Sequence, residues 1–443
     1  MRRTQLFATF TLKTVAVTVI ALTLVASCSA ASQETILHSF QLGGDGTGPQ
    51  SAGVIADAQG NLYGVTMGGG ANALGAVFEL SPQQNGTWTE TLLYSFLNNG
   101  VDGASPVGSL ILDTQGNLYG ATAQGGSADD GTVYELTPSR SGPWKETILH
   151  DFNCHTSKDG CRPDSSLIFD QAGNLYGETA IGACTQGGGI DCGTIFDLSP
   201  SAGSWTETII HRFRGGLTAK GGSAPGSGMI WDKDGSLYGV CSTGGPWGWG
   251  LVWELDPGKN GKWQETVLWE FGPAVNNPPR GGGPDSSLVM DNAGNLYGVT
   301  PYGGGGPGGG GVVYELSPGS KGWKETVLHK FFESKTDSDG MYANSLAIDA
   351  TGNLYGTAYA GGGVGEPRCP DWFMGCGVVF ELTPASEGKW KETILHRFKN
   401  DSGDGDGGEP WPDRLLLDSD GNIYGTTQRG GDANSGTVFE IKR

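Results

Sequence analysis

Residues 109–122 read Ser-Leu-Ile-Leu-Asp-Thr-Gln-Gly-Asn-Leu-Tyr-Gly-Ala-Thr, which is a short apolar run, a Gly-Asn pair and a second apolar run. Gly and Asn tolerate the positive φ of tight turns, so this stretch predicts a β-hairpin. Variants of its Gly-Asn-Leu-Tyr-Gly core start at Gly60, Gly116, Gly173, Gly235, Gly294, Gly352 and Gly421. The hairpin is therefore part of a repeat unit that occurs seven times in the sequence.

Two further strand patterns accompany every hairpin. A strand of the type Val-Phe-Glu-Leu ends at Leu80, Leu136, Leu198, Leu255, Leu316, Leu382 and Ile441. A strand of the type Glu-Thr-Ile-Leu starts at Glu34, Glu90, Glu146, Glu207, Glu265, Glu325 and Glu392. Four short antiparallel strands repeated seven times predict an all-β, seven-bladed β-propeller. No segment keeps a helical period of apolar residues, so we expect no helix beyond the N-terminal leader.

The phase of the repeat predicts how the ring closes. The repeats begin with the last strand of a unit (34–40) and end with a third strand (437–441), so residues 34–40 should complete the last blade. This arrangement removes an open sheet edge. We expect one domain over 34–441, with blades at 49–96, 105–152, 163–213, 225–271, 284–331, 343–398 and 412–441.

The N-terminus has the pattern of an export signal. Basic Arg2, Arg3 and Lys13 precede an uncharged apolar stretch at 14–26, which is short for a membrane span and typical of a signal-peptide core. Val25-Ala26-Ser27-Cys28 resembles a lipobox, in which Cys28 would be lipidated; Ser29-Ala30-Ala31 offers ordinary cleavage instead. Both alternatives place the mature protein in the periplasm, on the outer membrane or outside the cell.

Composition narrows the class of partner. The chain of 443 residues contains 79 Gly and carries a net charge of −20, which argues against nucleic acids and anionic membrane surfaces. We expect membrane attachment only through a lipid on Cys28, and a monomer.

The repeated pattern of Asp-Gly, Pro, strand, Gly-Asn-Leu-Tyr-Gly-Thr, Gly-Thr-Val-Phe-Glu-Leu and Glu-Thr-Val-Leu-His resembles the GloVer tandem-repeat family of exported bacterial proteins. The resemblance covers 34–441. It implies export, a surface anchor and a repeat fold, and it supplies no activity and no functional residues.

The loops that vary between repeats point to one functional face. They follow the fourth or the second strand of a unit, and such loops share one rim of a propeller, which we call the top. Cysteines pair within three of these loops, and in an exported protein they predict local disulfides Cys154–Cys161, Cys184–Cys192 and Cys369–Cys376. Cys241 is left over and is expected to be a buried free thiol.

Aromatic and charged residues outside the repeat are the candidate ligand contacts. They are Trp247, Trp249, Trp372, Trp411, Tyr302, Arg280, Arg368 and Asp371. Flat aromatic side chains beside polar groups suit a sugar ring or a peptide side chain, although packing within the loops explains them as well. An acidic stretch with Asp401, Asp404, Asp406 and Glu409 resembles a calcium loop, with a solvated acidic loop as the plainer interpretation. We therefore expect no cofactor and keep calcium as the alternative.

Repeated polar residues are expected to be structural. Five of the six histidines share one position of the fourth strand, where Tyr94 and Trp269 stand in other repeats, so packing explains them. The repeated acid of the third strand and the Asp-Gly pairs at Asp45, Asp102, Asp159, Asp339 and Asp406 indicate hydrogen bonding and turns. With no acid–base constellation, we expect a non-enzymatic module that binds an extracellular polysaccharide or surface protein through its top loops. A polysaccharide lyase or hydrolase with one site at the channel mouth is the alternative, and a structural envelope component is a third.

Overall fold

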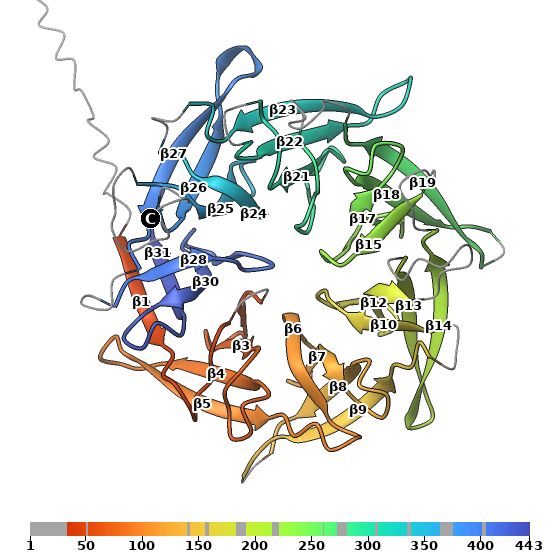
Figure 1. Cartoon of the computed structure of the whole chain (residues 1–443), viewed down its shortest axis with the longest axis vertical. Helices are drawn as coiled ribbons and strands as arrows, with labels where there is room; N and C mark the ends of the chain where they lie inside the picture. The colour runs from red at the N-terminus through yellow and green to blue at the C-terminus, as the bar shows by residue number, and fades with distance from the viewer. Residues whose placement is uncertain are drawn as a thin grey trace, which may run out of the picture. The chain divides into compact units, whose positions relative to one another are not determined.

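The chain folds into seven small antiparallel sheets arranged in a ring, a β-propeller (Figure 1). The computed structural model describes residues 33–49, 52–139, 142–155, 159–182, 192–214, 221–259, 261–272, 281–305, 309–334, 338–363, 375–400 and 405–443. The predicted leader with Cys28 lies outside them. Within these ranges the one helical segment is the 3-10 turn Ser386–Gly388, and no helix is long and apolar enough to cross a membrane.

Each blade places its strands in chain order from the channel outward, and the strands of the first four blades are as follows. Blade 1 holds β2 (Ile55–Ala56), β3 (Leu62–Thr66), β4 (Ala76–Pro82) and β5 (Trp88–Ser95). Blade 2 holds β6 (Gly103–Leu112), β7 (Leu118–Gly125), β8 (Thr132–Thr137) and β9 (Lys145–Asp151). Blade 3 holds β10 (Gly160–Pro163), β11 (Ile168–Phe169), β12 (Leu175–Gly182), β13 (Thr194–Ser201) and β14 (Ser204–Arg212). Blade 4 holds β15 (Gly222–Pro225), β16 (Ile230–Trp231), β17 (Leu237–Gly244), β18 (Leu251–Pro257) and β19 (Trp263–Glu270).

The remaining three blades repeat the plan. Blade 5 holds β20 (Val289–Met290), β21 (Leu296–Thr300), β22 (Val312–Ser317) and β23 (Lys324–Lys330). Blade 6 holds β24 (Met341–Ile348), β25 (Leu354–Ala360), β26 (Val378–Pro384) and β27 (Trp390–Arg397). Blade 7 holds β28 (Gly407–Pro410), β29 (Leu416–Leu417), β30 (Ile423–Gly430), β31 (Thr437–Lys442) and the N-terminal β1 (Gln33–Ser39). Because β1 pairs with β31 from Gln33↔Lys442 to Ser39↔Thr437, the predicted ring closure is confirmed.

The innermost strands depart from a regular ladder. In blades 3, 4 and 7 the inner strand is split in two around a bulge, and in blade 2 the register shifts between Val107 and Ile111. Several inner strands also begin before the predicted blade starts, at Gly103, Gly160, Gly222, Met341 and Gly407. In four of these strands, at Gly103, Gly160, Gly222 and Gly407, a proline follows within three residues, and proline is usually found at a strand boundary.

The hairpin motif is held by a repeated aspartate. In blade 2, Asp113 accepts hydrogen bonds from the backbone N–H of Gln115 and Asn117, the Asn117 side chain at 2.8 Å and the Tyr119 hydroxyl at 3.2 Å. Tyr119 also lies 3.2 Å from Glu135 of β8. The predicted structural role of the repeated third-strand acid is therefore confirmed in this blade.

The second glycine of the motif leaves room for an aromatic ring of the neighbouring strand. A Cβ on Gly239 of β17 would lie 2.3 Å from the fully buried Trp253 ring of β18. The same closeness recurs between Gly64 and Phe78 and between Gly425 and Phe439. Glycine at this position is thus a packing requirement of the blade core.

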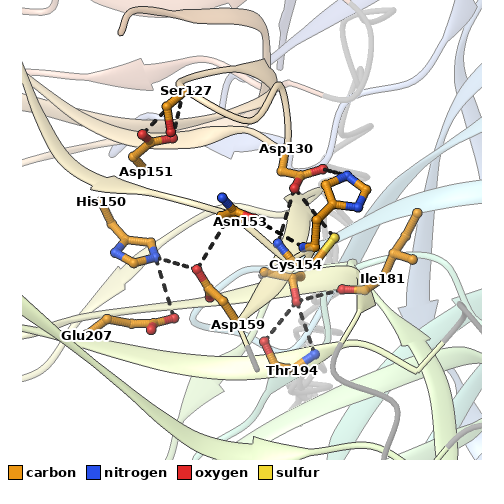
Figure 2. A network of polar contacts seen from close by, with 12 residues as sticks. Ser127, Asp130, His150, Asp151, Asn153, Cys154, Asp159, Ile181, Thr194 and Glu207 are labelled. Atoms are coloured by element: carbon orange, nitrogen blue, oxygen red, sulfur yellow. Dashed lines mark hydrogen bonds and ion pairs between the residues drawn. The ribbon is translucent and has the colours of Figure 1, made fainter. Parts of the chain in front are cut away.

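The repeated histidine joins neighbouring blades. His150 of β9 stacks edge-on against Phe152, with ring centroids 4.5 Å apart, so the packing prediction is confirmed. Its Nε2 also lies 3.0 Å from Asp159 and 3.7 Å from Glu207 of the next blade (Figure 2). The same group of three recurs as His329, Asp339, Glu392; as His396, Asp406, Glu34; and as His38, Asp45, Glu90.

Tyr94 shows that this inter-blade contact is structural. It occupies the histidine position between blades 1 and 2, and its hydroxyl lies 3.0 Å from both Asp102 and Glu146. Because a tyrosine keeps the hydrogen bonds, the contact needs a polar aromatic side chain and not an imidazole. The loop aspartates also accept backbone N–H groups, as Asp102 does from Leu97 at 2.7 Å, which fits their predicted role in turns.

The cysteines agree with the disulfide prediction where they are described. Cys154 and Cys161 form a disulfide, and Cys192 and Cys376 are also disulfide-bonded. Their predicted partners Cys184 and Cys369 lie outside the described residues. Cys241 is a buried free cysteine, as predicted.

Candidate functional site at the channel mouth

One backbone feature recurs at the start of every inner strand. A residue with φ between 51° and 64° occurs here in all seven blades, inside the inner strand of blades 2, 3, 4, 6 and 7 and ahead of it in blades 1 and 5. We call these residues the left-handed ring; they are Gly48, Ser105, Arg162, Ala224, Gly283, Tyr342 and Glu409. A left-handed conformation is costly for a residue with a side chain. Here a hydrogen bond to the preceding blade offsets the cost, since the N–H groups of Ser105, Arg162 and Tyr342 each reach a loop carbonyl at 2.8 Å. The backbone conformation at this position is the same in every blade, but the side chain differs. Each blade therefore presents a different side chain around the channel.

Two adjoining hollows open beside this ring on the top side. The first has a volume of about 460 Å³ and reaches from blade 3 to blade 7. The second has a volume of about 500 Å³ and lies along blades 4 to 7. They share Asp285, Asn344, Tyr359 and Trp411, and we call them together the channel-mouth cavity. Its size is typical of a small-molecule site.

Aromatic side chains form one wall of the cavity. Tyr302 follows β21, Tyr342 and Tyr359 belong to β24 and β25, and Trp411 follows β28. The rings contact one another in two groups, with centroids 6.1 Å apart for Tyr302 and Tyr342 and 5.0 Å apart for Tyr359 and Trp411. Tyr302 remains 50% exposed, so its ring is accessible to a ligand.

Tyr359 is fixed in place from behind. Its hydroxyl donates a 2.7 Å hydrogen bond to Glu409, a buried member of the left-handed ring. Glu409 in turn forms a 3.1 Å ion pair with Arg429 of β30. The pair of carboxylate and guanidinium therefore positions an aromatic wall residue and is not itself part of the cavity lining.

Carboxyl groups from three blades reach the opposite side of the cavity. Asp164 of blade 3 and Asp413 of blade 7 lie in the bulges of split inner strands, and Asp285 of blade 5 lies just ahead of β20. Asp413 accepts hydrogen bonds from the hydroxyls of Ser166 and Ser287. Arg414 beside it reaches the carbonyl of Met229 in blade 4 at 3.4 Å. These contacts cross the channel, and below them a separate hollow is lined by Ser287 and Arg414 among apolar residues.

The surroundings raise the affinity of these carboxyls for protons. Burial, together with the negative charges of Asp164 and Asp413, raises the pKa of Asp285 to about 7. Burial raises the pKa of Asp164 to about 6, against the opposing effect of Arg162. Both side chains are accessible to solvent within the cavity, yet the inner strands surround them, which disfavours the charged form.

A fourth carboxyl lies behind the cavity. Glu178 of β12 is fully buried and accepts a 2.9 Å hydrogen bond from the N–H of Gly228 in blade 4. Burial raises its pKa to about 8. The equivalent residues of the other six blades are uncharged, so Glu178 is a departure from the repeat; they are Val65, Ala121, Val240, Val299, Thr357 and Thr426.

The structure brings together only some of the predicted ligand contacts. Trp411 and Tyr302 line the cavity, and Trp249 stacks against Tyr302 with ring centroids 6.5 Å apart. Trp247 is 54% exposed and does not line it. Arg280, Arg368, Asp371 and Trp372 lie outside the described residues.

Only part of the predicted calcium loop lies among the described residues. Asp401 and Asp404 are outside the described residues. Asp406 accepts a 2.8 Å hydrogen bond from the N–H of Lys399 and lies 3.3 Å from His396, while Glu409 is bound to Tyr359 and Arg429. The contacts of Asp406 and Glu409 are thus explained by the fold itself.

Sequence reasoning missed Asp164, Asp285, Asp413, Glu178, Tyr342 and Tyr359. A signal was present in the alignment of the repeats. Asp164 and Asp285 follow a repeated proline, at a position that is uncharged in the other five blades, where it holds Gln50, Val107, Gly226, Asn344 and Trp411. An ionisable residue where the other repeats have an uncharged one marks a departure that the repeat fold does not need.

Solved structures share the fold at low identity. A fungal alcohol oxidase in complex with copper is 17% identical with a TM-score of 0.54, covering 93% of this chain and 76% of that one. A putative 6-phosphogluconolactonase from Bacteroides uniformis is 12% identical with a TM-score of 0.50, covering 88% and 92%. The extracellular domain of a putative one-component system from B. thetaiotaomicron is 12% identical with a TM-score of 0.52, covering 91% of this chain. The chain spans 40% of the length of that last structure.

Such likeness concerns the fold, and the described functions of the three proteins differ from one another. The search of curated proteins returned no match to this chain. The Gloeobacter/Verrucomicrobia repeat matches residues 18–230 and 180–439, which together cover nearly the whole propeller. The chain therefore belongs to the Gloeobacter/Verrucomicrobia repeat family, as the sequence resemblance predicted.

Proposed function

We propose that this propeller is an exported protein that binds an extracellular saccharide in the channel-mouth cavity. The observation that carries the proposal is the cavity wall of Tyr302, Tyr342, Tyr359 and Trp411, which faces polar groups from other blades. Aromatic faces suit the apolar face of a sugar ring, and carboxyl and hydroxyl groups suit its hydroxyls. The leader at 1–28, with Cys28 as an anchor, would place the site outside the cytoplasm.

Binding to a glycan array tests the proposal. We expect purified protein to give a selective saccharide signal, and Trp411→Ala to lower the affinity for that saccharide by about tenfold or more, because a stacked aromatic ring is lost. Trp247→Ala is the matched control, since Trp247 is exposed but does not line the cavity. A blank array, or equal losses in the two variants, would contradict the proposal.

Hydrolysis of a glycosidic bond is the second candidate. It is favoured by the convergence of Asp164, Asp285 and Asp413 from three blades, since glycoside hydrolysis requires two carboxyl groups in different protonation states. Asp285, with its raised pKa, would be the acid. Release of new reducing ends from the bound saccharide, abolished in Asp285→Asn with binding retained, would establish it; binding without cleavage leaves the protein a binding module.

A further inference from the structure

The charge of the cavity lining limits which saccharides the cavity can bind. Three aspartates contribute to its lining, and no Lys, Arg or His lines it among the described residues. Arg414, the closest basic neighbour of Asp413 in the chain, is directed across the channel to the carbonyl of Met229. The carboxylates of the lining would repel an anionic saccharide and attract a cationic one.

Asp285 is the carboxyl group that is available to a ligand. Asp413 is engaged by Ser166 and Ser287, and Asp164 lies within the field of Arg162. Asp285 has no hydrogen bond or ion pair with any residue in the described part of the chain, and it lines both hollows. It also stands in the hollow that Tyr302, Tyr342, Tyr359 and Trp411 line, and aromatic faces attract cations.

The spacing of the carboxyls favours an organic cation over a metal ion. Among the described residues, the groups of potential ligand atoms that lie within 4.8 Å of one another do not include Asp164, Asp285 and Asp413. One small ion would therefore not be shared by these three side chains. An ammonium group carried on a sugar ring can approach Asp285 while the ring itself contacts the aromatic wall.

We propose that the channel-mouth cavity selects a saccharide that bears a protonated amino group, with Asp285 as the residue that recognises it. This proposal rests on the proposed function, because the same aromatic wall binds the sugar ring. Ser242 and Thr243 of β17 and Gln428 of β30 supply further polar groups at the rim for the ring hydroxyls.

Isothermal titration with three matched oligosaccharides tests the inference. The probes are a β-1,4-linked glucosamine tetramer, its fully N-acetylated form and cellotetraose, which differ in the group at one ring carbon. We expect the glucosamine tetramer to bind at least tenfold more tightly than the other two at low salt. We expect Asp285→Asn to remove that difference, so that the glucosamine tetramer no longer binds more tightly than cellotetraose. Asp420→Asn makes the same chemical change at an exposed turn and serves as the control.

Each other outcome separates the two proposals. If the N-acetylated tetramer or cellotetraose binds as tightly as the amine, or if Asp285→Asn keeps the preference, charge selection is wrong and saccharide binding stands. If no saccharide binds, both proposals fail. Tetralysine is included as a fourth probe, and tight binding of tetralysine with no saccharide binding would identify a basic peptide as the ligand and overturn this inference.

Discussion

Ser166 of blade 3 donates a hydrogen bond to Asp413 of blade 7, although 247 residues separate them in the chain. Ser109 of blade 2 donates its N–H to the same Ser166 hydroxyl at 2.7 Å, so Asp413 ends a chain of contacts around the channel. We expect Asp413→Ala to lower the free energy of unfolding by about 1–3 kcal/mol, since the Ser166 hydroxyl loses its acceptor. Urea denaturation measures the change, and an unaltered midpoint would show that the cross-channel contact is dispensable.

We expect a glycine substitution in the left-handed ring to stabilise the fold. Ala224 has φ 51°, a conformation that costs a residue with a Cβ about 1–2 kcal/mol. Glycine loses about 0.5–1 kcal/mol through chain entropy, so Ala224→Gly should raise stability by roughly 0.5–1 kcal/mol. Ala56→Gly, on exposed strand β2, is the control and should lower stability. The same sign for both substitutions in thermal denaturation would refute the prediction.

The glycine–aromatic pairs predict a large effect from one methyl group. Gly239→Ala would place a Cβ 2.3 Å from the Trp253 ring, and the blade core must shift to admit it. We expect a loss of about 1–3 kcal/mol in the free energy of unfolding, typical of an overpacked core. Gly44→Ala, where no atom lies within 4 Å of the added Cβ, should change stability by less than about 0.5 kcal/mol. Guanidinium denaturation of the two variants side by side gives the comparison.

Buried inter-blade glutamates make stability depend on pH. Burial, followed by the contact with Asp159, raises the pKa of Glu207 to about 8, and burial likewise raises that of Glu146 to about 8. The unfolded chain binds these protons less tightly, with a pKa near 4.3, so their contribution to stability is complete below about pH 4 and is lost as pH rises through 8. We expect the melting temperature to fall from pH 5 to pH 9, and Glu207→Gln to reduce that slope. A melting temperature that rises over this range would be the contrary result.

The hairpin aspartates have the opposite effect on stability: they make it fall as the pH becomes acidic. Burial alone would raise the pKa of Asp349, but hydrogen bonds from Thr351 and Asn353 bring it down to about 2. Its contribution is therefore present above about pH 4 and is lost as pH falls through 2. Together with the glutamates, this places the expected maximum of stability near pH 4–5.

The fold was readable from the sequence because each blade needs the same few residues. Asp113 and Tyr119 hold one hairpin, and their equivalents recur wherever the motif does. The closing strand was readable for the same reason, since Glu34 begins a fourth-strand pattern without the first three. Histidine was read correctly as a packing residue, but its ion pairs were missed, because Glu207 belongs to another blade than His150.

Most of the candidate site could not be predicted from the sequence, because it depends on distances across the ring. Asp164, Asp285 and Asp413 come from inner strands of blades 3, 5 and 7, and sequence spacing does not show that their side chains reach one cavity. Trp411 and Tyr302 were found because aromatic residues outside the repeat are conspicuous. Tyr359 was missed because it follows the hairpin motif and resembles one more strand residue.

The pairing of Gln33 with Lys442 has a consequence for how the protein is made. β1 has no partner strand until β31 has been synthesised, so the growing chain carries an unpaired β-edge until then. The ring can close only when β31 is present, and a product that lacks β31 would lose the pairing of β1 and the closure of the ring together.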